Sequence, residues 1–253
     1  MAKWVTVTLR GVSKLEVPLM EYRETRALQI LEALGTRPAA PFYESGPARY
    51  ILDVLEGLGV AHRVDDFGNV IGHYRGGPKS NHEDRPPIAL VAHMDHPGFE
   101  LVEAGQHGYR VRALGGVPVA SMSNPTPVQV LLPGGVRLPG ELVPLKPPLS
   151  DDPTCRLTVL RLENDVALDP PLPVVFALPD FQLDGGYIRM RALDDLAGCA
   201  AVLSVLERLV EDSAEADVYA VFTRAEEVGL IGASLIAETG VLPQETLVVS
   251  VES

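Results

Sequence analysis

A histidine and an aspartate directly follow a short apolar run in the stretch IALVAHMDH, residues 88–96. The run predicts a buried strand, and His93, Asp95 and His96 lie within four positions at its end. In an open sheet flanked by helices, ligands bind beyond the carboxyl ends of the strands. An imidazole and a carboxylate at such a place could bind a metal ion or move a proton, although an exposed surface turn also explains the stretch.

Acidic residues follow three other extended runs. The run IRMRAL is followed directly by Asp194 and Asp195, and the run TLVVSV is followed directly by Glu252. Glu226 and Glu227 come two residues after the end of the run VYAVFT. Each position has an ordinary alternative. The two aspartates could cap the following helix, the two glutamates could be a solvated pair, and the last glutamate could simply be exposed.

If these acids gather with His93 at one sheet edge, their charges conflict. Carboxylates a few ångströms apart raise each other's pKa strongly, and a divalent cation relieves the repulsion. Imidazole nitrogen and carboxylate oxygen suit zinc, and also cobalt or manganese. The pattern therefore favours a metal site.

The elements that would position these residues follow from periodicity and turn residues. The sequence predicts helices over 21–34, 46–59, 195–211 and 232–239 and strands over 88–93, 217–223 and 246–251, with a hairpin around the turn DFGN, residues 66–69. Between them, Pro and Gly become frequent and short β-rich runs replace helices. We therefore predict an α/β domain with a mostly parallel sheet flanked by helices, residues 1–104 plus 189–253, and an inserted small β-domain, a barrel or sandwich, over 105–188.

Composition restricts the function classes. The chain has 253 residues, 46% hydrophobic and 22% charged, as in a soluble globular protein, and its net charge of -13 argues against nucleic-acid binding. No apolar run approaches the roughly 20 residues of a membrane span, and the first residues do not resemble a secretory signal. Two cysteines make no disulfide framework, and Cys199 is predicted to be buried. We expect a cytoplasmic protein without membrane or nucleic-acid partners.

Three segments together resemble a known enzyme family. AHMDHPGF, ALDDLAG and FTRAEEVGLIGA, in this order, are similar to the signature segments of the co-catalytic metallo-aminopeptidases, in particular the glutamyl-aminopeptidase and endoglucanase-M-like group that includes the tetrahedral aminopeptidases. The upstream DDFGNVIG resembles the family's Asp-x-x-Gly-Asn hairpin. The inserted β-domain lies where this group carries its own, so the resemblance covers essentially the whole chain.

The resemblance implies a role for each residue. His93 would bind one of two zinc ions, Asp194 would bridge both, Glu227 would bind the second and Glu252 would complete the first. Glu226 would be the general base. Asp95 would orient the imidazole of His93, whereas Asp195 is expected in the first turn of the helix. Peptide substrates and a homo-oligomer, from a dimer up to a dodecamer, are further implications.

Two features depart from the family pattern. The family has a sixth ligand, a histidine, downstream of the position of Glu252, but here the sequence ends at Ser253 and all six histidines lie at or before His107. We therefore expect an incomplete chain, with a mononuclear or inactive site as the alternatives. Glu252 stands where the aminopeptidases usually have Asp, and His96 is expected to be an exposed turn residue.

The leading hypothesis is a metal-dependent exopeptidase that removes N-terminal residues from peptides through metal-activated water and the base Glu226. One alternative is a deacylase or carboxypeptidase-like amidohydrolase on the same scaffold. The other is a non-catalytic metal-binding or assembly subunit.

Overall fold

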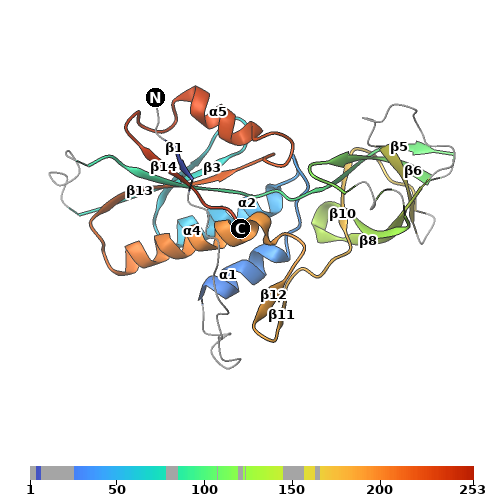
Figure 1. The fold of residues 1–253 in the computed structure, drawn as a ribbon, viewed down its shortest axis with the longest axis horizontal. Helices are drawn as coiled ribbons and strands as arrows, with labels where there is room; N and C mark the ends of the chain where they lie inside the picture. The colour runs from blue at the N-terminus through green and yellow to red at the C-terminus, as the bar shows by residue number, and fades with distance from the viewer. Residues whose placement is uncertain are drawn as a thin grey trace.

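The structure, a computed structural model, divides into a layered sheet with helices and a closed β-barrel beside it (Figure 1). It describes residues 26–77, 85–106, 108–118, 122, 124–144, 157–162 and 166–253, together with the backbone of 4–6. Cys155, His107 and the first residues of the helix predicted over 21–34 lie outside the described residues.

Six strands form the sheet, in the order β1-β14-β4-β13-β3-β2. Their bounds are Trp4–Thr6 for β1, Ala61–Val64 for β2, Val70–Gly76 for β3, Ile88–His93 for β4, Ala216–Thr223 for β13 and Leu247–Ser250 for β14. β1, β14, β4 and β13 are parallel neighbours, whereas β3 is antiparallel to β13 and β2 is antiparallel to β3.

The sheet is therefore mixed, and the prediction of a mostly parallel sheet is wrong. The β2–β3 hairpin is one reason, because its turn is much shorter than the crossover of a dozen or more residues that parallel strands need, and the antiparallel pairing of β3 with β13 is the other. Asp65 stabilises this turn, because its Oδ1 accepts the backbone N–H groups of Phe67, Gly68 and Asn69 at 3.0, 2.8 and 2.9 Å.

Helices cover both faces of the sheet (Figure 1). α1 (Arg26–Gly35), α2 (Ser45–Gly57) and α4 (Leu193–Glu211) lie on one face, and α5 (Ile231–Thr239) lies on the other. The apolar side of α4, including Leu196, Cys199 and Leu203, is buried with Phe222 of the sheet in one core. No helix in the described part of the chain is long and apolar enough to cross a membrane.

The barrel follows β4 almost at once. Its strands are β5 (Gly98–Gly105), β6 (Gly108–Leu114), β7 (Thr126–Leu131), β8 (Arg137–Val143), β9 (Leu157–Leu162) and β10 (Leu172–Phe176), closed in the order β10-β5-β6-β9-β8-β7. Alternate residues such as Phe99 and Leu101 fill its interior. A separate hairpin, β11 (Gln182–Asp184) with β12 (Tyr187–Arg189), leads back to α4. The barrel strands thus span 98–176, and the division at 105 and 188 remains a prediction.

Candidate metal centre at the carboxyl edge of the sheet

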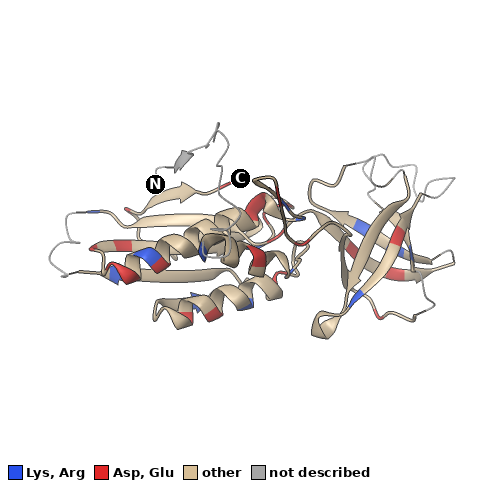
Figure 2. Ribbon diagram, turned by 90° about the horizontal axis from the view of Figure 1, so that it is seen from below, with Lys and Arg blue, Asp and Glu red and all other residues tan. Residues whose placement is uncertain are grey.

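His93, the last residue of β4, is the centre of the candidate site. Its side chain is only 3% exposed, and its Nε2 lies 3.1 Å from Oδ1 of Asp194. The same nitrogen lies 3.7 Å from Oε2 of Glu226 and 3.7 Å from Oε2 of Glu252. β14, β4 and β13 are parallel neighbours, so the residues after them meet at one edge. Figure 2 shows acidic segments beside the C-terminus at this edge.

Asp194 and Asp195 open α4 and face the site differently. Asp195 is fully buried, and its carboxylate accepts the backbone N–H of His93 at 3.2 Å and that of Gly198 at 3.1 Å. The side chain of Asp194 is 60% exposed and contacts His93. Ligand atoms of His93, Asp195 and Glu252 all lie within 4.8 Å of one another. Asp195 lies in the first turn of α4, and it also belongs to the group of possible ligands with His93 and Glu252.

Glu226 and Glu227 lie in the turn that follows β13. The buried carboxylate of Asp95 accepts the backbone N–H of Glu226 at 3.0 Å and that of Glu227 at 3.1 Å. The side chain of Glu227 lies beside Gly115 and Gly116, in the loop that follows β6 of the barrel. The structure thus brings the carboxylate of Glu226 to His93. Glu227 is not part of the group that His93 forms with Asp195 and Glu252.

Asp95 also holds the ring of His93. Nδ1 of His93 lies 3.0 Å from the backbone oxygen of Asp95 and 3.6 Å from its Oδ1. A proton on Nδ1 would satisfy both oxygens and would leave Nε2 free to face the acids. Asp95 therefore lies where it could orient the imidazole of His93.

Burial and like charges shift the protonation of the whole cluster. Burial opposes a charge on His93, but the hydrogen bond and charge of Asp95, with Asp195 and Glu226 nearby, outweigh it and raise the pKa of His93 to about 10. Burial, aided by Glu252, raises the pKa of Asp195 to about 8. Burial also raises the pKa of Glu226, with contributions from Glu252 and Asp95.

The donor set fits a divalent cation. One imidazole nitrogen faces carboxylate oxygens of Asp194, Glu226 and Glu252, so the cluster carries excess negative charge when these acids are ionised. A cation bound among these oxygens would replace the proton that His93 otherwise retains. Nitrogen with carboxylate oxygen is a ligand combination typical of zinc, cobalt or manganese sites.

Sequence reasoning missed two buried polar residues behind the site. His96, expected to be exposed, is only 1% exposed: its Nε2 accepts the N–H of Ala39 at 3.1 Å and its Nδ1 donates to the carbonyl of Pro97 at 3.0 Å. The expectation is wrong because the α1–α2 connection covers this turn. Glu44 is also fully buried, beside α2, and a single acid before a helix carries no sequence signal of this.

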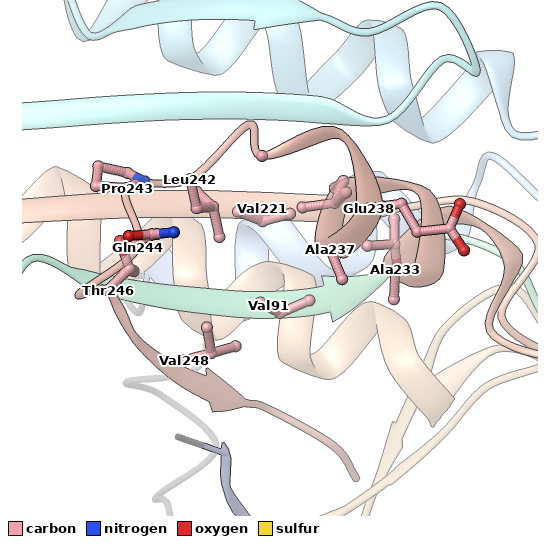
Figure 3. Close-up of a pocket in the computed structure, with 13 residues that line it drawn as sticks. Val91, Val221, Ala233, Ala237, Glu238, Leu242, Pro243, Gln244, Thr246 and Val248 are labelled. Atoms are coloured by element: carbon pink, nitrogen blue, oxygen red, sulfur yellow. The ribbon is translucent and has the colours of Figure 1, made fainter. Parts of the chain in front are cut away.

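A well-formed cavity of about 390 Å³ lies elsewhere, between α5 and the sheet (Figure 3). Val91, Val221 and Val248 of the sheet face α5 across it, and its lining includes none of the candidate site residues. Its lining is mainly apolar.

Comparison with known proteins shows what this chain is similar to. Residues 165–252 match the model of the M42 glutamyl aminopeptidases. A putative aminopeptidase of Acetivibrio thermocellus is 29% identical over 183 residues, which cover 69% of this chain and 51% of that protein. A lysyl aminopeptidase of Pyrococcus furiosus is 29% identical over 91 residues, 35% of this chain and 24% of that protein. The chain thus spans about half the length of the first of these relatives or less.

Solved structures share the fold. The dodecameric PhTET1-12s superimposes with a TM-score of 0.69 at 26% identity, covering 87% of this chain and 66% of that one. The TET1 peptidase of Pyrococcus horikoshii, described as assembling into a tetrahedron or a large octahedral shell, has a TM-score of 0.72 at 24% identity, covering 89% of this chain and 68% of that one. The match of residues 165–252 and these neighbours confirm that the chain resembles the M42 glutamyl aminopeptidases, the group that its three motifs indicated.

Proposed function

We propose that this chain carries the metal centre of a metal-dependent exopeptidase that removes N-terminal residues from peptides. One observation carries the proposal: Nε2 of His93 faces carboxylates of Asp194, Glu226 and Glu252 at 3.1 to 3.7 Å. The names of the relatives, all aminopeptidases, support peptide bonds as the substrate class. Because the chain spans only part of these relatives, the activity of the whole protein is part of the proposal.

The proposed ligands of the first metal ion are His93, Asp194 and Glu252, with zinc as the metal and cobalt or manganese as substitutes. Asp194 would bridge to a second ion held by Glu227. The buried carboxylate of Asp195 lies within reach of the same ion and is a competing ligand to Asp194. A divalent metal bound there supplies Lewis acidity, which activates a water molecule and polarises the scissile carbonyl.

The protein's own residues would move the proton. Glu226 has a raised pKa and is part-buried at the edge of the site, so it can accept a proton from the attacking water and return it to the leaving amine. Asp95 would keep the proton of His93 on Nδ1 and leave Nε2 as the ligand atom. Both roles depend on the turn that follows β13 keeping its shape.

Further parts of the proposal come from the comparisons and the sequence. A homo-oligomer, from a dimer up to a dodecamer, is proposed because structural neighbours form such assemblies. An α/β domain of 1–104 plus 189–253 with a β-domain of 105–188 is the proposed division of the chain. The cytoplasmic location and the expected lack of nucleic-acid and membrane partners stay predictions from the sequence.

A site for one metal ion in a binding or assembly subunit is the second candidate. The position of Glu227 favours it, because its side chain lies beside Gly115 and Gly116 of the barrel loop and is not in the group of His93, Asp195 and Glu252. Hydrolysis of acylated amino acids instead of peptides would indicate the amidohydrolase alternative.

Metal titration tests the centre directly. Purified metal-free protein should bind Co²⁺ or Zn²⁺ tightly, and His93→Ala should abolish this binding. Asp194→Ala and Asp195→Ala, compared side by side, assign the aspartate ligand. Wild-type protein that binds no divalent metal, or undiminished binding in both aspartate variants, would refute the proposed centre. Hydrolysis of aminoacyl-anilides and of acylated amino acids then separates the candidate activities.

A further inference from the structure

Four consecutive backbone N–H groups in the turn after β13 each donate to a buried side chain. The N–H of Arg224 donates to Oδ1 of Asn69 at 2.9 Å, and that of Ala225 donates to Oε1 of Glu44 at 3.0 Å. Those of the next two residues, Glu226 and Glu227, donate to the carboxylate of Asp95 at 3.0 and 3.1 Å. The turn that carries both acids is therefore held along its length.

The three acceptors come from separate elements and are themselves fixed. Glu44, Asn69 and Asp95 are all fully buried, so water does not compete for these hydrogen bonds. Glu44 lies just before α2, Asn69 lies just before β3, and Asp95 follows β4. The turn is thus tied to three parts of the α/β domain that are remote from one another in sequence.

Glu44 makes the larger set of contacts. Its Oε1 accepts the N–H of Phe42 at 2.8 Å in addition to that of Ala225, and its Oε2 accepts Nε of Arg224 at 2.7 Å. The guanidinium of Arg224 also donates to the carbonyl oxygens of Phe42, at 2.6 Å, and Phe67. One carboxylate therefore holds both the backbone and the side chain of the turn's first residues.

Asn69 is oriented from two sides. Its Nδ2 donates to Oδ2 of Asp65 at 2.7 Å and to the carbonyl of Gly232 at 3.2 Å, which leaves Oδ1 for the N–H of Arg224. The DFGN hairpin noticed in the sequence thus ends in a side chain that reaches the turn after β13. The side-chain amide of Asn69 is thus the contact by which the hairpin supports the turn after β13.

The turn needs such support because of its backbone. Ala225 is fully buried and has a φ of 53°, a left-handed conformation that residues other than glycine rarely adopt. Strained residues of this kind persist only where surrounding contacts determine them. The conformation of Ala225 sets the direction in which the next two residues, Glu226 and Glu227, leave the strand.

We infer that Glu44 and Asn69 are positioning residues for the two acids: they hold Arg224 and Ala225 so that Glu226 faces His93 and Glu227 leaves the turn beside it. The inference rests on the proposed function, in which these acids are the base and a ligand of the second ion. Neither residue touches the His93 cluster, so their effect passes through the backbone of the turn.

The test compares Glu44→Ala, Glu44→Gln and Asn69→Ala with the control Asp180→Asn. Asp180 also pairs with arginines, because its Oδ1 lies 2.8 Å from both Arg137 and Arg191, but it lies outside the turn. Glutamine at position 44 keeps an oxygen for the N–H of Ala225 and loses the acceptor for Nε of Arg224, so Glu44→Gln should be intermediate.

Amide hydrogen exchange of Glu226 and Glu227 in metal-free protein is the first readout. Their acceptor is Asp95, so a merely local effect of Glu44→Ala or Asn69→Ala would leave their exchange unchanged. We expect exchange of these two amides to be at least about 10-fold faster in both alanine variants and unchanged in Asp180→Asn. Unchanged exchange in both alanine variants would overturn the inference.

Co²⁺ titration is the second readout. The second equivalent should bind about 10- to 100-fold more weakly in Glu44→Ala, the usual effect of losing a residue that supports a ligand. The first equivalent, held by His93 and Glu252, should be little affected. Second-equivalent binding equal to wild type would overturn the inference, even if the melting temperature falls. If wild-type protein binds one Co²⁺ or none, the proposed dinuclear function is contradicted. Amide exchange then tests by itself whether Glu44 and Asn69 position the turn.

Discussion

Replacing His96 by glutamine tests how a buried neutral imidazole makes the stability of this fold depend on pH. The ring accepts the N–H of Ala39 at one nitrogen and donates to the carbonyl of Pro97 at the other. Protonation would place a donor opposite the N–H of Ala39 in a site closed to water, which is costly. A glutamine amide can offer an oxygen to Ala39, and it does not titrate.

The magnitude follows from the two pKa values. Burial is the main cause that lowers the pKa of His96 to about 4 from the ordinary 6.5, and the positive charges of Arg191 and His93 add to it. The two values differ by about 2.5, and each unit corresponds to about 1.36 kcal/mol, so acidification through both values would lower the free energy of unfolding by about 3 kcal/mol through this residue.

The direction follows from proton binding. Between about pH 4 and about pH 6.5 the unfolded chain binds a proton at this histidine and the folded protein does not. The stabilisation is therefore fully present above pH 6.5 and is lost as the pH falls toward 4. His93, whose pKa is raised to about 10, has the opposite dependence and loses its contribution above this window.

Urea unfolding of metal-free protein, followed by circular dichroism between about pH 7 and about pH 4.5, measures the effect. Wild-type protein should lose up to about 3 kcal/mol more stability over this range than His96→Gln. His62→Gln, at an exposed histidine, is the matched control and should follow the wild-type curve. Parallel curves for wild type and His96→Gln would refute the account of a buried neutral imidazole.

Three further predictions concern the base, the core and the start of the barrel. In a protein that shows peptidase activity, Glu226→Gln should lower turnover by about 100-fold or more, measured with an aminoacyl-anilide, and leave the metal content by elemental analysis unchanged; full activity or lost metal contradicts its role as base. Phe222→Ala, in the core between the sheet and α4, should cost about 3 to 5 kcal/mol in urea unfolding, and a cost below about 1 kcal/mol would show that the site collapses without a cavity. Gly98→Ala would bring a Cβ to 2.9 Å from the carbonyl oxygen of Val174 and 3.0 Å from Cβ of Ala40, so a lowered melting temperature is expected, and an unchanged one would mean that the junction yields freely.

Local patterns in the sequence were enough to locate the main elements of the α/β domain. The strand predicted over 88–93 matches β4, and the helices predicted over 195–211 and 232–239 correspond to α4 and α5. Such elements are predictable because their periodicity and end signals lie within a few turns of the chain. The buried position of Cys199, at 0% exposure, is confirmed for the same reason, since it lies on the apolar side of a clear helix.

A topological rule predicted from the sequence that His93, Asp194, Glu226, Glu227 and Glu252 gather at one edge. The structure brings all of these acids except Glu227 within 3.7 Å of His93. Residues after neighbouring parallel strands meet at one edge, and β14, β4 and β13 are such neighbours. The rule needs only strand ends and direction, so it does not depend on side-chain packing. It could not say how each of the two aspartates lies relative to His93, because that depends on how the first turn of α4 is oriented.

Only the tertiary structure decided the features that rest on contacts between distant segments. β3 pairs antiparallel with β13, which makes the sheet mixed, and strand pairing across more than a hundred residues leaves no local pattern. His96 is buried because the α1–α2 connection covers it, and Glu44 is buried because Arg224 and Ala225 arrive from 180 and 181 residues away to meet its carboxylate. A polar residue is predicted from sequence to be exposed, because burying a polar group without a partner is unfavourable. Its burial becomes stable only when the folded chain brings a hydrogen-bond partner to it.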